Sequence, residues 1–320
     1  MMQRAATIAL LAAFVASPAA SQQIIAIAAN PQGSQFFTVA AAVAKLLEEH
    51  GIHARVQPMG GPTTYVPLLS RGEFEFAMAN ADDADTGYHG TEAYDGKPNR
   101  ELKLVAAMFP LPVSIAVVGD SPAKTLRDLK GMRITAGFAS QTTLRKVQDA
   151  LLANAGLTMA DMRPVPVVNV FQGTDALAGG RLDAASTAPT INQSREADVT
   201  LSSHGGIRFL PIDTAPGPLA AMQKIIPSRT LTLTPAQNLP GIKVPTPVMA
   251  YSTFLIASDK TSDELVYRIA KTMHDAPGEL KESTPVLKGF NPAAMAEAMT
   301  VPYHPGAEKY YREIGQWPPK

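Results

Sequence analysis

Short apolar runs alternate along the chain with longer segments in which apolar residues recur every three or four positions. Residues 24–29 form a continuous apolar run, which predicts a strand, and residues 36–50 carry apolar side chains at helical spacing, which predicts a helix that ends at Gly51. Strands that alternate with helices are typical of parallel βαβ units, so this part of the chain predicts an α/β layer fold. The same pattern predicts further strands at 53–57, 74–79 and 104–108 and a short helix at 64–70.

A second block repeats this pattern after residue 110. Helical spacing at 142–155 predicts a helix that Gly156 ends, and a shorter helix is predicted near 173–178. The block therefore predicts a second α/β lobe at residues 111–212. Its apolar runs predict strands at 113–118, 133–136, 165–168, 183–186 and 208–211.

The last third of the chain is too small for an α/β lobe of its own. Residues 211–247 are rich in proline and lack periodicity, which predicts a connecting segment on the surface. A strand is predicted at 249–257, a helix capped by Ser262 follows it, and a final helix is predicted at 305–314. We therefore expect the chain to return to the first lobe, which then comprises residues 22–110 and 213–320.

The N-terminus has the layout of a secretory signal peptide. Arg4 supplies the positive charge, residues 5–16 form an apolar stretch, and small residues follow up to Ser21. A membrane anchor is disfavoured because the apolar stretch falls short of the roughly 20 residues that cross a bilayer. We expect residues 1–21 to be cleaved and the mature protein to be located outside the cytoplasm.

Composition excludes several classes of function. The 320 residues contain 28 Lys and Arg against 28 Asp and Glu, so the formal net charge is zero and no nucleic-acid partner is expected. Cysteine is absent, which excludes thiol nucleophiles, disulfides, iron–sulfur ligation and cysteine zinc sites.

Sequence motifs of enzymes are mostly missing as well. The chain has no phosphate-binding loop, no dinucleotide-binding glycine pattern, no nucleophile elbow and no HExxH zinc motif. His50 and His53 lie at a helix end and a strand start, a placement that does not direct both at one metal. Asp82, Asp83 and Asp85 lack the spacing of a calcium loop and are interpreted as the acidic first turn of a helix. We therefore expect no catalytic activity, no cofactor and no metal.

Polar loops stand where predicted strands pass into helices. In open α/β sheets such loops line a crevice at the carboxyl ends of the strands, and the helix starts attract anions through free N–H groups and the helix dipole. A single loop of this kind is more simply a helix cap or a turn, but five loops from two lobes favour a binding site. The candidate ligand-binding residues in these loops are Gln32, Gly33, Ser34, Gln35, Gly60, Gly61, Thr63, Thr64, Asn80, Asp82, Ser140, Gln141, Thr142, Thr143, Pro189 and Thr190.

The C-terminal residues 302–315 (PYHPGAEKYYREIG) closely resemble the closing motif of TAXI-family solute receptors, the periplasmic binding proteins of tripartite ATP-independent periplasmic (TRAP) transporters. The resemblance implies a two-lobed periplasmic binding protein of the type II-like class, in which each lobe is a βαβ sheet with flanking helices and the ligand cleft lies between the lobes. Weaker matches, which extend the similarity over nearly the whole mature chain, lie at residues 69–77, 126–131, 175–177 and 180–185.

The resemblance also implies a function. A receptor of this family captures a small organic solute, here expected to be carboxylated and of the amino acid or oxo/dicarboxylate class, and delivers it as a monomer to the membrane permease subunits of a TRAP transporter. This chain departs from the family at the ligand: the glycine-rich first loop keeps one glycine, Gly33, and residues 140–143 replace the usual Gly-Ser-Gly-Thr. The bulkier loops reduce the access of a ligand to the loop backbone. Whether this chain binds the usual glutamate or 2-oxoglutarate type of ligand is therefore an open question.

The candidate loops contain no arginine, the usual bidentate clamp for a carboxylate. Arg145, one helical turn past Thr142, is the nearest candidate, and it is either a clamp or a solvated surface charge. We expect backbone N–H groups and hydroxyls near Ser34 and Thr142 to hold the carboxylate, with the threonines of the other loops as flanking donors. If Asp82 reaches the crevice, it should face an ammonium or hydroxyl group of the ligand.

Two other classes of function stay open. A periplasmic sensor subunit would bind the same ligand and signal to a membrane kinase, and a neighbouring gene for a permease or for a kinase would discriminate between the two. An enzyme on the same fold, such as a pyrimidine synthase, is disfavoured by the resemblance and by the missing cysteines, and turnover of candidate substrates would identify it.

Overall fold

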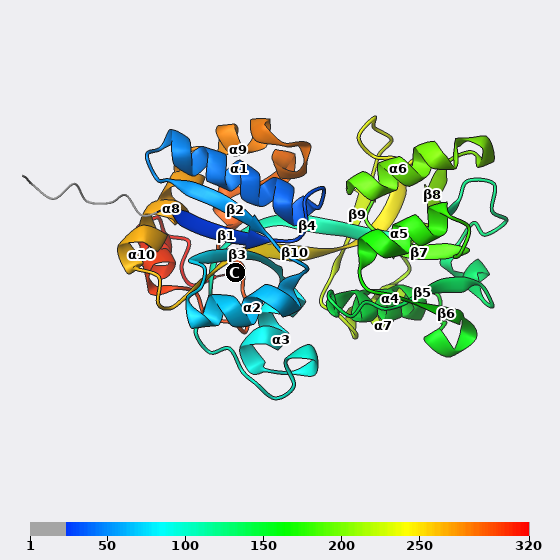
Figure 1. Ribbon diagram of the computed structural model, residues 1–320, viewed down its shortest axis with the longest axis horizontal. Helices are drawn as coiled ribbons and strands as arrows, with labels where there is room; N and C mark the ends of the chain where they lie inside the picture. Colours follow the sequence, from blue (N-terminus) through cyan, green and yellow to red (C-terminus); the bar gives the residue numbers. More distant parts are fainter. Residues whose placement is uncertain (1–23, 320) are drawn as a thin grey trace, which may run out of the picture.

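The chain forms two α/β lobes joined by two long strands (Figure 1). The computed structural model describes residues 24–319, so the signal peptide predicted at residues 1–21 lies outside the described residues. The two joining strands are β4 (Leu102–Val118) and β10 (Thr246–Ser258), which pair antiparallel and run from one lobe into the other.

The first lobe contains three parallel strands between two layers of helices. β1 (Ile25–Ala29) and β3 (Phe76–Asn80) are buried along their whole length, as expected for apolar runs that are covered on both faces. β1 pairs in parallel with β3 and with β2 (Ala54–Pro58). Helix α1 (Gln35–Glu49) covers one face of this sheet in Figure 1. The other helices of this lobe are α2 (Pro62–Arg71) and α3 (Ala81–His89) on the opposite face, followed by α8 (Asp263–Asp275), α9 (Pro277–Ser283) and α10 (Pro305–Glu313).

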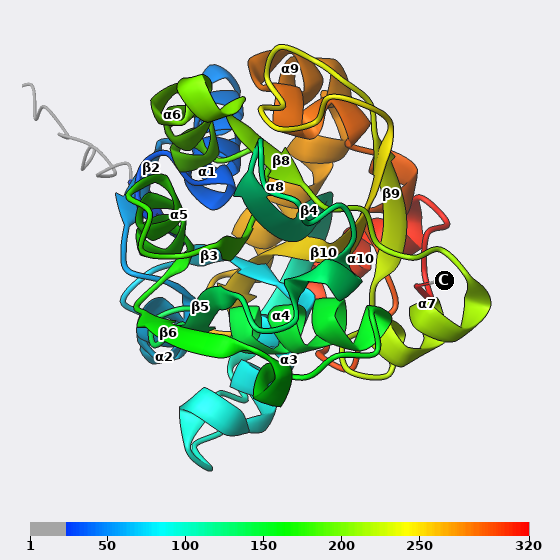
Figure 2. The same ribbon diagram turned by 90° about the vertical axis from the view of Figure 1, so that its right-hand side faces the viewer.

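The second lobe repeats this arrangement on a smaller scale. Its elements are β5 (Arg133–Gly137), α4 (Thr143–Asn154), β6 (Arg163–Val167), α5 (Val170–Ala178), β7 (Ala184–Thr187), α6 (Asn192–Thr200), β8 (Ile207–Phe209), α7 (Pro216–Gln223) and β9 (Arg229–Leu233). β5 pairs in parallel with β6 and β7, and Figure 2 shows α5 and α6 on one side of these strands and α4 on the other. The main sheet has the order β2-β1-β3-β10-β4-β7-β5-β6 and continues through both lobes.

β4 is one continuous strand, whereas the sequence predicts two strands at 104–108 and 113–118. Pro110 and Pro112 separate the two apolar runs without ending the strand. At the two prolines β4 pairs with β10 on one side, and its other side is a free edge because β7 begins to pair with β4 only at Ser114. Proline is tolerated at such a free edge, where no backbone N–H is needed.

The proline-rich stretch after residue 213 packs on the second lobe, which differs from the predicted boundary. α7 contacts α4, β9 pairs with β10, and Met222 and Ile226 are buried in the core of the second lobe. The prolines conceal this packing because α7 begins at Pro216 and is only eight residues long. The chain returns to the first lobe within β10, between Tyr251 and Phe254, and not at residue 213.

The closing motif builds the end of the first lobe that faces away from the second lobe (Figure 1). The hydroxyl of Tyr311, which is fully buried, donates to the backbone oxygen of Val105 at 2.7 Å. The backbone N–H of His304 donates to the backbone oxygen of Leu104 at 2.8 Å, and burial lowers the pKa of the His304 side chain. The segment that carries the family resemblance therefore attaches α10 to β4 and stabilises this lobe.

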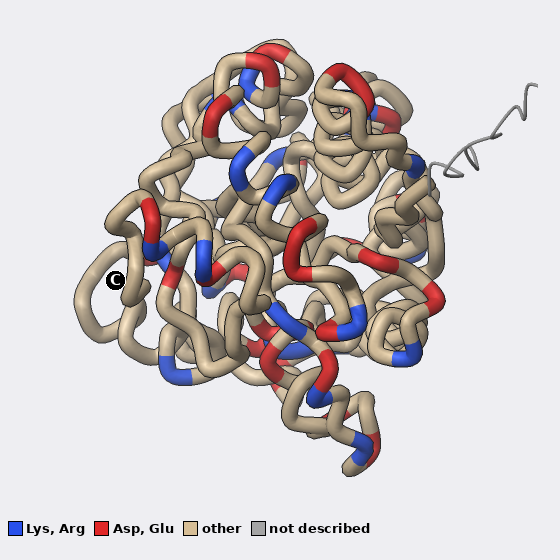
Figure 3. Tube along the Cα trace, turned by 90° about the vertical axis from the view of Figure 1, so that its left-hand side faces the viewer, with Lys and Arg blue, Asp and Glu red and all other residues tan. Residues whose placement is uncertain are grey.

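Charged residues of both signs are distributed over the trace. Figure 3 shows Lys and Arg interspersed with Asp and Glu at the end of the first lobe. Within residues 24–319, no helix combines the length and the apolar character that crossing a membrane requires.

Candidate ligand-binding site

A cavity lies between the lobes, where the strands of both lobes pass into their helices. Its volume is about 60 Å³, well above the roughly 10–15 Å³ that a cavity needs to hold one water molecule, so it admits a few waters or a small solute. The lining residues are Asn30, Ser34, Gln35, Phe36, Pro62, Asn80, Asp83, Leu111, Val113, Gln141, Thr143, Leu144, Val170, Phe171, Ala188, Ile191 and Tyr251.

Six helices, three from each lobe, begin at this cavity. Lining residues occupy the cap position or the first turn of α1, α2, α3, α4, α5 and α6. The local sequence sets these starts: Ser34 Oγ accepts from the N–H of Phe37 at 3.0 Å, and Asn80 Oδ1 accepts from the N–H of Asp83 at 2.8 Å. The positive ends of six helix dipoles therefore point at one small volume, which favours a negative group inside it.

Asp83 is the one charged residue among the described residues that line the cavity. It is 3% exposed, and it accepts hydrogen bonds from Thr143 Oγ1 of the other lobe at 2.5 Å and from Asn80 Nδ2. Burial raises the pKa of Asp83 to about 7, against the opposing effect of the Thr143 hydrogen bond, and the neighbouring charge of Asp82 raises it further. The carboxyl group thus changes protonation near neutral pH and offers its remaining acceptor positions to a ligand.

Two further polar side chains of the wall have hydrogen-bonding capacity for a ligand. Gln35 donates from Nε2 to Thr190 Oγ1 of the other lobe, but its buried Oε1 has no partner within residues 24–319. A buried unpaired acceptor costs about 1–3 kcal/mol, so a donor group of a ligand at this position would recover that cost. Burial, and then the charges of Asp83 and Asp82, raise the pKa of Tyr251 well above its usual range, so this hydroxyl stays protonated and available as a donor.

The rest of the wall is apolar. Leu111 and Val113 of β4 and Phe36, Leu144 and Phe171 of the surrounding helices supply most of it. Few polar groups in a mostly apolar wall are typical of a site for a small organic molecule.

Loops that were predicted to bind a ligand hold the two lobes together. Thr63 Oγ1 donates to the backbone oxygen of Ser140 at 2.9 Å, and the N–H of Asn192 donates to the backbone oxygen of Gly33 at 3.4 Å. Gly61 is needed at this contact because a Cβ atom there would lie 2.2 Å from the Ser140 oxygen. The structure therefore shows the lobes closed around the cavity.

The predicted ligand-binding residues fall into three groups in the structure. Those that line the cavity are Ser34, Gln35, Asn80, Gln141 and Thr143. Those that contact the other lobe without lining the cavity are Gly33, Gly61, Thr63, Asp82, Ser140 and Thr190. Those that lie outside the cavity wall are Gln32, Gly60, Thr64, Thr142, Arg145 and Pro189.

The geometry bears on the expected roles of three of these residues. Arg145 is exposed and lines no part of the cavity, so it is not placed to clamp a carboxylate there. Thr142 has helical backbone angles (φ −63°, ψ −29°) and caps α4 with no side-chain hydrogen bond, so Thr143 is the threonine of this loop that reaches the cavity. Asp82 accepts a hydrogen bond from Lys146 Nζ at 2.7 Å and does not line the cavity.

Sequence reasoning missed Asp83, Tyr251 and the apolar wall. Asp83 occupies the third position after the Asn80 cap, where an acidic residue usually stabilises a helix start, and only its burial against Thr143 distinguishes it from such a residue. Tyr251 and Leu111 stand in apolar runs that have the pattern of core strands. Residues 24–319 contain no group of three or more His, Asp or Glu side chains arranged to hold an ion.

The fold and the cavity define a two-lobed α/β protein of the periplasmic binding protein type. The chain belongs to the NMT1-like family, whose model matches residues 27–315.

Several solved structures share this fold at low sequence identity. The alkanesulfonate-binding protein SsuA from Xanthomonas axonopodis pv. citri, bound to MOPS, is 18% identical over 90% of this chain and 83% of its own, with a TM-score of 0.50. PhnD1 from Prochlorococcus marinus, in complex with methylphosphonate, is 12% identical over 92% and 98%, with a TM-score of 0.56. A structure described as a periplasmic transporter is 15% identical over 93% and 94%, with a TM-score of 0.58.

Proposed function

We propose that this protein is a periplasmic solute-binding protein that captures a small organic solute between its lobes and delivers it, as a monomer, to the permease subunits of a TRAP-type transporter. The observation that carries the proposal is the cavity between the lobes, where six helices begin and where Gln35 Oε1 is buried without a partner in residues 24–319. A buried unpaired acceptor and a small cavity between the lobes fit a bound molecule better than a packed core.

The proposed ligand is a small carboxylated solute that also carries a hydrogen-bond donor, as amino acids do. Six helix starts favour a negative group, whereas Asp83 favours an ammonium or hydroxyl group on the same molecule. The cavity volume of about 60 Å³ favours a solute with few non-hydrogen atoms. Two proteins of the same fold are bound to MOPS, which carries a sulfonate group, and to methylphosphonate, so both of these ligands carry an anionic group.

Closure supplies the affinity in this proposal. A solute that contacts both lobes binds the closed form better than the open form and thereby shifts the equilibrium toward closure. Hydrogen bonds to a charged group contribute about 1.5–3 kcal/mol each, so several such contacts reach the about 8.2 kcal/mol of a micromolar dissociation constant.

The TRAP-type partner is supported by the closing motif at residues 302–315. Reconstitution of the protein with its neighbouring permease in vesicles tests this assignment. Solute uptake that an ion gradient drives without ATP is expected, and uptake that requires ATP would assign the protein to another transporter class.

The binding function is tested by native mass spectrometry of the protein released by osmotic shock. A co-purified molecule of low mass, at one per chain, is expected. Its identity is then checked by calorimetry on protein that has been unfolded, dialysed and refolded. Protein that carries no solute and binds none from a panel of amino acids and short carboxylic acids would contradict the proposal.

A further inference from the structure

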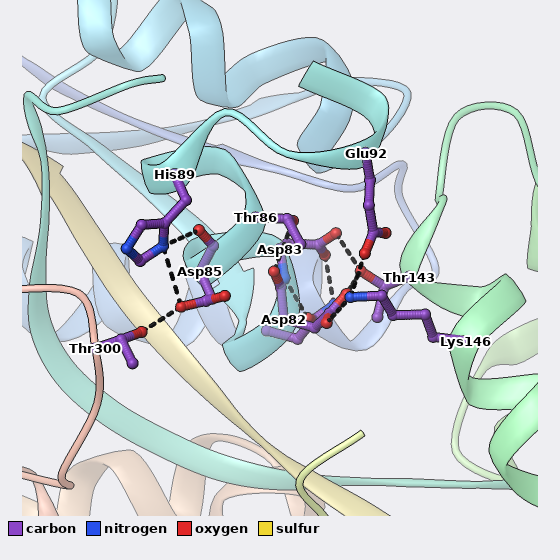
Figure 4. A network of polar contacts seen from close by, with 10 residues as sticks. Asp82, Asp83, Asp85, Thr86, His89, Glu92, Thr143, Lys146 and Thr300 are labelled. Atoms are coloured by element: carbon purple, nitrogen blue, oxygen red, sulfur yellow. Dashed lines mark hydrogen bonds and ion pairs between the residues drawn. The ribbon is translucent and has the colours of Figure 1, made fainter. Parts of the chain in front are cut away.

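A bridge of charged side chains crosses between the lobes beside the cavity. Lys146 of α4, in the second lobe, places its Nζ 2.7 Å from Asp82 Oδ1 and 2.5 Å from Glu92 Oε1 (Figure 4). Both carboxylates belong to the first lobe: Asp82 stands in the first turn of α3, and Glu92 opens a short 3₁₀ helix (Glu92–Tyr94) after it. One ammonium group of one lobe therefore bridges two carboxylates of the other.

This bridge is separate from the ligand-binding groups. None of its three side chains lines the cavity, although Thr143, one turn before Lys146 on α4, does. Thr143 Oγ1 lies within hydrogen-bond distance of both Asp82 Oδ2, at 3.0 Å, and Asp83 Oδ1, at 2.5 Å, so its single proton is shared between the carboxyl group next to the bridge and the one in the cavity wall. The side chains of Lys146 and Asp82 are only 28% and 10% exposed, so solvent and salt screen this contact less than a surface ion pair.

The backbone of Glu92 supports a specific role for its carboxylate. Its φ is +53°, in the left-handed region that residues other than glycine seldom adopt. Such a conformation costs free energy and persists where the surroundings require it. The side-chain contact that the structure shows for Glu92 is the one with Lys146, so the strained residue is the one that reaches across to the other lobe.

We propose that Lys146 is a positioning residue that latches the lobes closed: it bridges Asp82 and Glu92 in the closed form, does not touch the ligand, and sets how long the closed form lasts. This proposal rests on the proposed function, because closure matters for a protein that traps a solute. Contacts made only in the closed form shift the equilibrium toward that form, and they act through the lifetime of the complex more than through the rate of encounter.

The test measures closure directly and needs no ligand. The chain has no cysteine, so the exchanges Arg71→Cys in the first lobe and Arg181→Cys in the second, both at exposed positions, allow two spin labels to report the distance between the lobes. In this background, Lys146→Gln should raise the ratio of open to closed molecules at least fivefold. Lys146→Arg should keep the ratio of the parent protein, because it retains the charge and two donors for the two carboxylates.

Two matched controls separate the latch from general effects. Arg145→Gln removes the adjacent exposed charge of the same helix and should leave the distances unchanged. Glu92→Gln, on the other lobe, should shift the distances in the same direction as Lys146→Gln. Raising NaCl from about 50 to about 500 mM should open the parent protein but not the Lys146→Gln variant further.

The proposal is overturned if Lys146→Gln and Arg145→Gln give the same distance distribution, or if the parent protein shows only the open distance. Far-ultraviolet circular dichroism and thermal unfolding establish that each variant is folded. Because no solute is added, failure of this test leaves the proposed function standing, and a failed search for a co-purified solute leaves the distance measurement valid.

Discussion

The carboxyl group of Asp83 binds its proton more tightly in the folded protein than it would in the unfolded chain, where water surrounds it. Its pKa is about 7 in the native protein, because of its burial, whereas the carboxyl group of an unfolded chain titrates near 3.9. The native state therefore binds this proton more tightly than the unfolded state, and protonation stabilises the fold. Above pH 7 Asp83 is deprotonated in the native protein, and this negatively charged native form is less stable against unfolding than the protonated form.

The resulting prediction concerns stability against pH. The contribution of Asp83 to the free energy of unfolding should fall by as much as about 4 kcal/mol as pH rises from about 4 to about 7, and then level off. In Asp83→Asn this component should disappear and the slope should flatten, whereas Asp85→Asn, at a half-buried position on the same helix, should keep it. Urea unfolding at a series of pH values measures the slopes, and equal slopes in both variants would contradict the assignment to Asp83.

Gly61 and its neighbour Gly60 differ in how much room each leaves for a side chain, so the same substitution can be compared at the two positions. A Cβ atom at Gly61 would lie 2.2 Å from the backbone oxygen of Ser140 in the other lobe, whereas at Gly60 the nearest atom within reach, Thr64 Oγ1, is 3.5 Å away. Gly61→Ala should therefore keep the lobes apart and weaken solute binding at least tenfold with little change in thermal stability. Calorimetry and spin-label distances measure both effects, and Gly60→Ala should behave as the parent; equal binding by both variants would show that Gly61 does not limit closure.

At the scale of elements, a hydrogen bond connects α10 to β4: the Tyr311 hydroxyl donates to the Val105 backbone oxygen at 2.7 Å. Tyr311→Phe removes the donor and leaves a buried acceptor unpaired, so the free energy of unfolding should fall by about 1–3 kcal/mol. Solute affinity should stay unchanged because α10 lies away from the cavity (Figure 1). Urea unfolding and calorimetry check the two expectations, and a loss of affinity without a loss of stability would assign the closing motif a role in binding.

The predicted elements show where sequence patterns suffice. Alternating apolar runs and helical spacing locate β1, α1 and α4, because each of these elements buries one face or both faces along its length. The sequence pattern does not predict α7, which begins at Pro216, because this helix is short and its apolar residues lie on no single face. Only its contact with α4 shows that it belongs to the second lobe.

The candidate site was predictable in its loops but not in its wall. Ser34 and Asn80 were found because polar cap residues mark helix starts in any sequence. Tyr251 and Leu111 were not found, because residues that face a cavity and residues that face a core have the same apolar pattern. Lys146 was not found either, because its partners lie more than fifty positions away and are brought near it only by the closed lobes.

At the scale of the whole molecule, the single tryptophan of the sequence reports on one lobe. Trp317 packs against Tyr303 at a ring distance of 5.6 Å and beneath Arg312; it lies against the core of the first lobe and does not line the cavity. Addition of the identified solute should therefore reduce the radius measured by small-angle scattering and leave the tryptophan emission unchanged. A shift of the emission at saturating solute would show that closure rearranges the surroundings of Trp317 as well.

The path of the chain through the two crossing strands has a consequence for the history of such proteins. The chain leaves the first lobe along β4 and comes back along β10, and at this crossing Val113 and Met249 are paired neighbours in the sheet. The second lobe is thus an insert whose entry and exit lie side by side. A recombination event at these two points would exchange one half of the recognition surface for another while the half that carries both described ends of the chain stays intact. New ligand preferences would then arise by replacing a module, with no need to rebuild the core of the first lobe.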